Sequence, residues 1–413
     1  MSFEQGPIRP PSEAESLFIR VTRNCPWNKC LFCPSYKRKK FSRRTVEEIK
    51  KDIGAIQEAL TKVKSYALKL GEGLNITRRT LEVVYHREPE LLQVAFWLFR
   101  GGKNVFLQDG DNLVMPAEQL AEVLSLIREQ FPTVERITTY SRAKTVTRRS
   151  VSELQMVREA GLNRIHIGLE SGHDPLLEYM RKGVTAAEHI EAGLKVKEAG
   201  LSLSEYVLLG LGGHKMWREH ALDTAKVLSA IDPHFIRIRT LTVRGGTPLQ
   251  EKIRTQEFQL LDDDGVVHEE RLLLENLRAG SYVVSDHILN LLEEIEGDLS
   301  RDRETLLGVI DRYLGMPGEK RANFRIGRRL GLYRYLRDMG DMQRYSQVEA
   351  IRKRLVEEGR DEEEFLEAVP PQVRLNKAEI NKGGLAQCTS QIRQRKKFRV
   401  PGNGQVNGGG LAL

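Results

Sequence analysis

Three of the four cysteines lie within nine residues, in the segment Cys25-Pro-Trp-Asn-Lys-Cys30-Leu-Phe-Cys33. A disulfide scaffold would need more cysteines, spread more evenly along the chain. Closely spaced thiols in a long chain are instead typical of metal ligands, because thiolates bind both zinc and iron–sulfur clusters. Three thiolates on one short loop can hold three irons of a cubane 4Fe–4S cluster and leave the fourth iron open to a small molecule.

The number of available protein ligands distinguishes a zinc site from an iron–sulfur cluster site. A structural zinc site is closed by four protein ligands. The remaining cysteine is Cys388, in a polar and glycine-rich segment near the end of the chain, and no histidine follows Cys33 within fifty residues. We therefore expect Cys25, Cys30 and Cys33 to hold an iron–sulfur cluster. Zinc, or buried thiols without a metal, is the alternative.

The elements around these cysteines form a strand, a loop and a helix. Residues 17–24 (LFIRVTRN) alternate apolar and polar side chains as a strand does. Further on, Thr45 and Glu48 form a Thr-x-x-Glu capping box, which predicts the start of a helix. The apolar residues that follow recur at helical spacing: Val46, Ile49, Ile53, Ile56 and Leu60. The cysteines therefore lie on the loop after the first strand.

Alternating strands and helices continue along the chain. The expected strands cover residues 105–108, 136–140, 164–170, 203–209 and 235–243, and the expected helices cover 116–130, 151–160, 186–199 and 217–231. Repeated βα units imply a parallel sheet with helical crossovers. We predict an α/β fold, a partial (β/α)6 TIM-like barrel, with functional groups on the loops after the carboxyl ends of its strands.

We expect this barrel over residues 17–249, after an N-terminal extension of residues 1–16. Residues 61–100 look helical and form an insertion, because a βα unit would normally return at once to the next strand. A helical C-terminal region of residues 250–369 should carry helices near 269–278, 283–296, 301–314 and 345–358. Residues 370–413 are polar, basic and glycine-rich, which is typical of a flexible tail.

Residues 17–249 resemble the radical S-adenosylmethionine (SAM) superfamily. The resemblance rests on three clustered cysteines, with the aromatic Phe32 before the last of them, on the loop after the first strand of a six-unit barrel. The most similar branch contains oxygen-independent coproporphyrinogen dehydrogenase, the elongator-type enzymes and the tRNA methylthiotransferases. One feature departs from the common pattern, because four residues instead of three separate the first two cysteines.

The resemblance also implies contacts for S-adenosylmethionine. The loop after the second strand, with Asp109, Gly110 and Asp111, would receive the amino group of the methionine moiety. Either aspartate also suits a helix cap or a loop stabiliser. The segment Ile165–His173, followed by Met180–Gly183, resembles the IGLESG and MxKG patterns of the branch.

Within these patterns, Glu170 would accept hydrogen bonds from the ribose hydroxyls or from another polar part of the ligand, with Ser141 nearby. Arg142 or Arg181 would pair with the methionine carboxylate, because a guanidinium group matches a carboxylate. Alternatively, Glu170 and Arg181 pair with each other. The implied cofactor contacts are Phe32, Asp109, Gly110, Asp111, Ser141, Arg142, Glu170, Arg181 and Leu209, the last of which lies in a segment that would face the adenine.

By this resemblance the chain is an enzyme that uses a 4Fe–4S cluster and S-adenosylmethionine. One electron cleaves a sulfur–carbon bond of the cofactor, and a 5′-deoxyadenosyl radical then abstracts hydrogen from a substrate. A single spare cysteine argues against an auxiliary cluster, and the sequence has no cobalamin-binding Asp-x-His-x-x-Gly segment. We therefore expect a simple hydrogen abstraction on a small molecule or an RNA, with an electron donor such as flavodoxin or ferredoxin.

The net charge of +8 permits anionic partners without requiring them. Residues 318–344 interleave basic residues with Phe324, Tyr333 and Tyr335, a pattern that suits RNA or an ordinary basic helix packed by its aromatic residues. The alternative functions are accordingly a zinc-stabilised protein that binds RNA or anions, and a non-catalytic relative of the enzymes.

His173 and His214 lie on predicted loops at the barrel mouth, where they could touch a substrate. No apolar run approaches the length of a membrane span, and the first residues lack a signal-peptide pattern. We therefore expect a cytoplasmic protein without membrane contact.

Overall fold

The computed structural model describes residues 3–8, 10–243, 245–359 and 365–366. The chain divides into two compact units, Met1–Leu314 and Gly315–Leu413. The tail expected over residues 370–413, with Cys388, lies outside the described residues. No helix in the described part of the chain has both the length and the apolar character that crossing a membrane requires.

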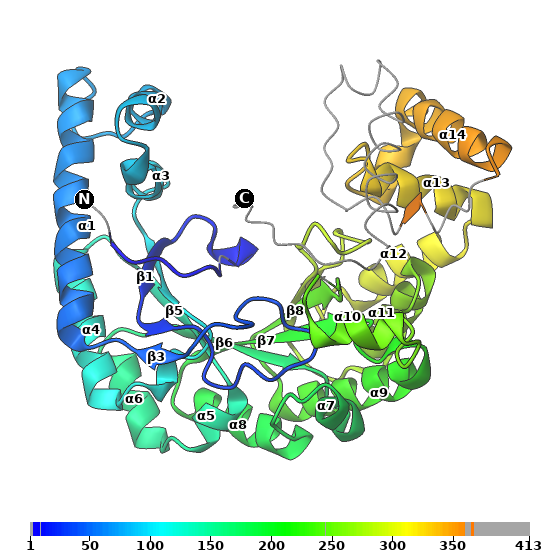
Figure 1. Cartoon of the computed structure of the whole chain (residues 1–413), viewed down its shortest axis with the longest axis horizontal. Coiled ribbons are helices and arrows are strands. Elements are labelled where there is room, and N and C mark those ends of the chain that lie inside the picture. Colours follow the sequence, from blue (N-terminus) through cyan, green and yellow to red (C-terminus); the bar gives the residue numbers. More distant parts are fainter. Residues whose placement is uncertain (1–2, 9, 244, 360–364, 367–413) are drawn as a thin grey trace, which may run out of the picture. The chain divides into compact units, whose positions relative to one another are not determined.

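The first unit is built on one eight-stranded sheet, in the order β1-β4-β5-β6-β7-β8-β9-β10 (Figure 1). Its first six strands are β1 (Leu17–Arg20), β4 (Asn104–Gln108), β5 (Arg136–Ser141), β6 (Arg164–Glu170), β7 (Ser202–Leu209) and β8 (Phe235–Thr240). Each of these pairs in parallel with the next, so their carboxyl ends share one edge. The predicted α/β fold with a partial (β/α)6 TIM-like barrel is therefore confirmed.

Two short strands extend the sheet beyond the six that were expected. β9 (Tyr282–Val284) pairs in parallel with β8, and β10 (Glu296–Asp298) pairs antiparallel with β9. The helix predicted over residues 283–296 is therefore wrong. Its apolar residues Leu292 and Ile295 are buried by a loop between two strands, because the open edge of β8 offers backbone partners that override helical spacing.

Helices form the crossovers on the outer side of the sheet (Figure 1). They are α1 (Val46–Lys69), α4 (Ala117–Gln130), α6 (Val151–Glu159), α8 (Ala186–Glu198) and α9 (Gly213–Ile231). The predicted capping box of Thr45 and Glu48 is present at the start of α1. α1 continues to Lys69, so residues 61–69 belong to this crossover, and α2 (Arg78–Arg87) and α3 (Leu92–Phe99) pack against it.

Shorter elements surround the carboxyl ends of the strands. The pair β2 (Thr22–Arg23) and β3 (Ser42–Arg43) brackets the cysteine segment. The short helices α5 (Ala143–Thr147), α7 (Asp174–Tyr179) and α10 (Pro248–Arg254) follow strand ends. The longer α11 (Asp263–Asn276) packs against α9 and against α12 (Arg303–Leu314). α11 and α12 match two helices that were expected near 269–278 and 301–314.

The second unit contains α13 (Gly318–Arg329) and α14 (Met342–Glu357). Two of the aromatic residues that interleave its basic segment, Phe324 and Tyr333, stack with ring centroids 6.1 Å apart. Both are buried, so they pack the interior of this unit and are not available to stack on nucleotide bases.

The inner face of the sheet is the face opposite the crossover helices, and it carries Phe106, Tyr140, His166, Tyr206 and Arg237. The N-terminal segment, residues 3–8 and 10–16, runs along this face (Figure 1). Near its start the backbone of Gly6 bonds to the Gln108 side chain. Near its end the buried Glu13 pairs with Arg136 at 3.1 Å and lies 3.4 Å from His166.

Candidate functional site

The three clustered cysteines lie on the loop between β2 and β3, here called the cysteine loop (residues 24–41). This loop follows β1, so it stands at the carboxyl edge of the sheet, where the sequence predicted functional groups. Cys25, Cys30 and Cys33 are free thiols of intermediate exposure. Their placement follows from contacts that bind the loop to neighbouring strand ends.

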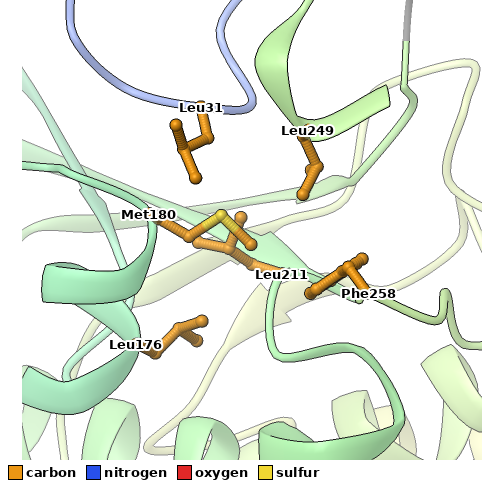
Figure 2. Close-up of a cluster of buried hydrophobic side chains, with 6 residues drawn as sticks. All are labelled: Leu31, Leu176, Met180, Leu211, Leu249 and Phe258. Carbon is orange, nitrogen blue, oxygen red and sulfur yellow. The ribbon is translucent and has the colours of Figure 1, made fainter. Parts of the chain in front are cut away.

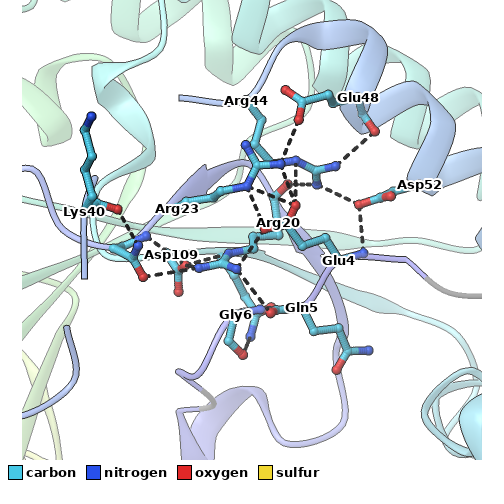
Figure 3. Close-up of polar contacts among 12 residues, drawn as sticks. Glu4, Gln5, Gly6, Arg20, Arg23, Lys40, Arg44, Glu48, Asp52 and Asp109 are labelled. Carbon is cyan, nitrogen blue, oxygen red and sulfur yellow. Dashed lines mark hydrogen bonds and ion pairs between the residues drawn. The ribbon is translucent and has the colours of Figure 1, made fainter. Parts of the chain in front are cut away.

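Asp109, the first residue after β4, holds the cysteine loop at two points, and Figure 3 shows its contact with Arg20. Its fully buried carboxylate accepts hydrogen bonds from Arg20 Nε at 2.8 Å, from the Asn24 backbone N–H at 3.1 Å and from the Tyr36 hydroxyl at 2.9 Å. Burial and the charge of Asp109 raise the pKa of Tyr36. Both oxygens of the Asp109 carboxylate are thus hydrogen-bonded within the protein, as the alternative role of a loop stabiliser requires. A direct contact between Asp109 and the methionine amino group stays a prediction.

Asp111 connects the loop after β4 to the loop after β5. Its buried carboxylate accepts hydrogen bonds from the Ser141 hydroxyl at 2.9 Å, the Arg142 backbone N–H at 3.3 Å and the Thr145 hydroxyl at 2.5 Å. Burial raises the pKa of Asp111 to about 6, against the effect of these hydrogen bonds. Asp111 therefore caps the start of α5, and the Ser141 hydroxyl is committed to it.

Gly110 lies between these two aspartates and directly against the cysteine loop. A Cβ atom at this position would stand 3.1 Å from the Tyr36 ring and 3.4 Å from Cys25 Cβ. Glycine is needed here because its missing side chain lets the backbone approach Cys25.

Trp27, inside the longer interval between the first two cysteines, fixes that interval to the chain after α7. Its indole N–H donates to the Arg181 carbonyl at 2.7 Å. Gly183 has a φ of +70°, and a Cβ there would come within 2.3 Å of the Trp27 ring. The Arg142 guanidinium lies 5.0 Å from the ring centroid and donates to the Lys182 carbonyl at 3.0 Å. The additional residue of the loop is thus accommodated by contacts of its own.

Glu170, at the end of β6, pairs with Lys182 at 3.0 Å and not with Arg181, whose side chain is exposed. Gly168 makes room for this pair, because a Cβ there would lie 2.4 Å from Glu170 Oε1. Burial raises the pKa of Cys30, and the positive charge of Lys182 opposes that rise. Lys182 is a site residue that the sequence analysis did not single out, although it is the lysine of the MxKG pattern.

Leu31 anchors the loop between Cys30 and Cys33. Its backbone N–H donates to the Met180 carbonyl at 3.0 Å, and its carbonyl accepts from the Leu249 N–H at 3.1 Å. The Leu31 side chain is buried in an apolar cluster, here called the Leu31 cluster, with Leu176, Met180, Leu211, Leu249 and Phe258 (Figure 2). This cluster draws together the cysteine loop, α7, α10 and the loop after β7.

The remaining predicted residues lie around this centre. Phe32 packs against the Leu31 cluster, and Lys182 Nζ is 6.0 Å from its ring centroid. Leu209 is fully buried on the outer face of β7, whereas its neighbour Leu208 packs against the cluster. His173 bonds to Asp223 of α9 at 2.8 Å. His214 is exposed at the start of α9.

The donor set of the cysteine loop fits an iron–sulfur cluster. It offers three thiols, a glycine that allows close approach, and a lysine whose positive charge favours the thiolate form of Cys30. A cubane binds each thiolate to a different iron, so its ligands need not converge on one point. Within the described residues, no group of three or more His, Cys, Asp or Glu side chains is arranged to hold a single metal ion.

One family model matches the part of the chain that holds the central strands. The model of the radical SAM superfamily matches residues 77–225, which include β4 to β7 but not the cysteine loop. An uncharacterized protein of Methanocaldococcus jannaschii is 27% identical over 161 residues, which are 39% of this chain and 49% of that protein. The match therefore spans about half the length of this curated relative.

Two solved structures are similar at lower identity. Methylornithine synthase is 19% identical with a TM-score of 0.40, and the match covers 75% of this chain and 84% of that one. Coproporphyrinogen III oxidase from Escherichia coli is 15% identical with a TM-score of 0.36, over 62% of this chain and 58% of that one. Both scores are low, so no functional argument rests on either likeness.

Proposed function

We propose that this chain is a radical SAM enzyme, because residues 77–225 match the model of that superfamily, and that Cys25, Cys30 and Cys33 hold the 4Fe–4S cluster that such enzymes use with S-adenosylmethionine. One observation carries the proposal: three free thiols share a loop that is bound to the carboxyl ends of β1 and β4 and to the chain after α7. When bound, the reduced cluster supplies the electron that cleaves S-adenosylmethionine into methionine and a 5′-deoxyadenosyl radical.

The residues of the chain divide into those that position the loop and those that face the cofactor. Asp109 and Asp111 act as positioning residues, because their oxygens are engaged within the protein. The Gly110 backbone stands beside Cys25, where a carbonyl can accept from the methionine ammonium group. Glu170, held by Lys182, offers its second carboxylate oxygen to the ribose hydroxyls.

Three other residues complete the proposed binding site. Arg142 holds the 182–183 backbone and the Trp27 ring, and it carries a positive charge toward the methionine carboxylate. Phe32 and the Leu31 cluster form an apolar cover that excludes water from the reacting atoms. We expect the reaction to be a hydrogen abstraction on a small molecule or an RNA.

The electron reaches the site from a one-electron carrier of the flavodoxin or ferredoxin kind. Four basic residues of the cysteine loop are exposed: Lys29, Arg38, Lys39 and Lys40. Their charge suits an acidic carrier, since complementary charge steers encounter between proteins.

The test is anaerobic reconstitution with iron and sulfide, followed by reduction with S-adenosylmethionine and measurement of 5′-deoxyadenosine. Wild-type chain should bind about four irons and form 5′-deoxyadenosine. Cys30→Ala should form none, whereas Cys388→Ala, which removes the one cysteine outside the loop, should behave as wild type. An intact cluster without 5′-deoxyadenosine would identify a non-catalytic relative. A colourless protein with stoichiometric zinc would favour the zinc-stabilised binding protein.

A further inference from the structure

The inner face of β5 to β8 is polar, and many of its buried groups have no partner. Register pairs place Tyr140 beside His166 and Tyr206 beside Arg237, so these side chains share one face. Within the described residues, the following buried atoms of this face make no hydrogen bond: Thr138 Oγ1, His166 Nδ1, Ser204 Oγ, Arg237 Nε and Arg239 Nη2. Buried polar atoms are nearly always bonded to protein, water or ligand, so their concentration on one face indicates a place that a polar ligand fills.

The β8 end of this face carries an excess of positive charge. Arg237 and Arg239 both pair with a single carboxylate, Asp286, at 3.3 Å and 2.9 Å. Two guanidinium groups against one carboxylate leave one positive charge over. Burial lowers the pKa of the nearby His166 to about 4, so its ring is neutral near pH 7 and adds no charge.

The guanidinium group of Arg239 lies over the ring of Tyr206. The Arg239 guanidinium carbon is 5.1 Å from the centroid of the Tyr206 ring, and Arg239 Nη2 is buried without a hydrogen bond in the described part of the chain. The Tyr206 hydroxyl interacts with Tyr140. A guanidinium N–H and a phenol O–H are donors that together suit the oxygens of a carboxylate.

Aromatic rings form the wall next to these donors. The ring centroid of Tyr206 is 5.8 Å from that of Tyr140 and 5.4 Å from that of His166. The ring centroids of Phe106 and Tyr140 are 5.3 Å apart. A flat apolar group bound beside the donors would therefore contact ring surfaces.

We propose that this face binds a small molecule through its carboxylate, held by Arg239, Arg237 and Tyr206. A monoanionic carboxylate matches the single charge left over, whereas a phosphate would bring a second negative charge. That the ligand is the substrate rests on the proposed function. Its position supports this, because Arg239 pairs in register with Leu208, which packs against the Leu31 cluster beside Cys30 and Cys33.

The experiment measures binding by calorimetry on the full chain without cluster or S-adenosylmethionine. Three matched probes are used: benzoate, the uncharged benzamide, and phenyl phosphate. Benzoate should bind at least about tenfold more tightly than either of the others, because it alone matches the charge of the site. Equal binding of benzamide, tighter binding of phenyl phosphate, or no binding of benzoate overturns the proposal.

Variants then locate the site. Arg239→Gln should weaken benzoate binding about tenfold or more, and Tyr206→Phe, which removes only the hydroxyl, should weaken it about threefold to tenfold. Arg218→Gln, on an exposed residue of α9, should leave it unchanged. If Arg239→Gln does not fold, Tyr206→Phe decides, and unchanged binding by that variant contradicts the assignment. Because no cluster is present, a chain that binds benzoate here yet forms no 5′-deoxyadenosine refutes only the proposed function.

Discussion

The hydroxyl of Tyr36 donates a 2.9 Å hydrogen bond to Oδ1 of Asp109, which joins the chain just after the last clustered cysteine to the end of β4. The other oxygen of the same carboxylate accepts from the Asn24 N–H, just before the first of these cysteines. One buried carboxylate therefore fixes the distance between the two ends of the thiol-bearing segment.

Tyr36→Phe should lower the free energy of unfolding by about 1–2 kcal/mol, because it leaves a buried carboxylate oxygen of Asp109 without its donor. The loop should also lose iron faster to a chelator after reconstitution. Urea unfolding and timed iron release measure the two effects. Tyr85→Phe, on a side chain that is 59% exposed, is the matched control. Wild-type values in both measurements would contradict the role given to this bond.

Gly183→Ala should destabilise the chain by about 1–3 kcal/mol, because the new methyl group overlaps the Trp27 ring at a position with positive φ. Replacing Trp27 by Ala in the same chain should recover part of this loss, since the overlap disappears. A thermal or urea double-mutant cycle measures the coupling. Gly308→Ala, in α12 with open space around it, should instead stabilise by about 0.5–1 kcal/mol. Additive effects of the Gly183 and Trp27 changes would exclude the contact.

Leu31→Ala should cost about 2–5 kcal/mol of stability, because it opens a cavity in the Leu31 cluster. The same change should reduce iron binding, since Leu31 lies between two of the proposed ligands. Leu68→Ala, on a side chain that is 57% exposed, should change stability by less than about 0.5 kcal/mol. If the two leucine variants unfold at the same denaturant concentration, the anchoring role is refuted.

Glu269 should make stability depend on pH. Burial raises the pKa of this carboxyl to about 8, although the Gly210 N–H bonds to it. The folded chain thus keeps a proton that the unfolded chain, with a pKa near 4.5, has lost, and the free energy of unfolding falls as the pH rises from about 5 to about 8.

Glu269→Gln cannot ionise, so it should reduce this fall by up to about 1 kcal/mol per pH unit. Urea unfolding at several pH values measures the slope, with Glu304→Gln on an exposed residue as control. A variant slope equal to that of wild type would show that Glu269 does not titrate as stated.

The sequence predicted what depends on local spacing. The strand around Phe106 and the capping box of Thr45 are both present, because alternation and helix caps are encoded within a few residues. The cysteine loop was likewise placed at the correct end of the sheet.

Contacts between distant segments could not be predicted in this way. Trp27 bonds to the Arg181 carbonyl, 154 positions along the chain, and the periodicity of apolar residues does not predict such a contact. The choice of Lys182 over Arg181 as the partner of Glu170 depends on a backbone with positive φ at Glu170 and Arg181. β9 is a strand because it pairs with the open edge of β8, and the residues of β9 alone do not predict that pairing.

The N-terminal segment on the inner face has a consequence for how the chain folds. Glu13 precedes its partner Arg136 by 123 positions, and His166 lies later still. This segment therefore cannot form its buried ion pair until β5 and β6 have joined the sheet. A pairing of such long range makes docking of the first residues a late event, so the interior of the barrel is covered only after most of the barrel exists.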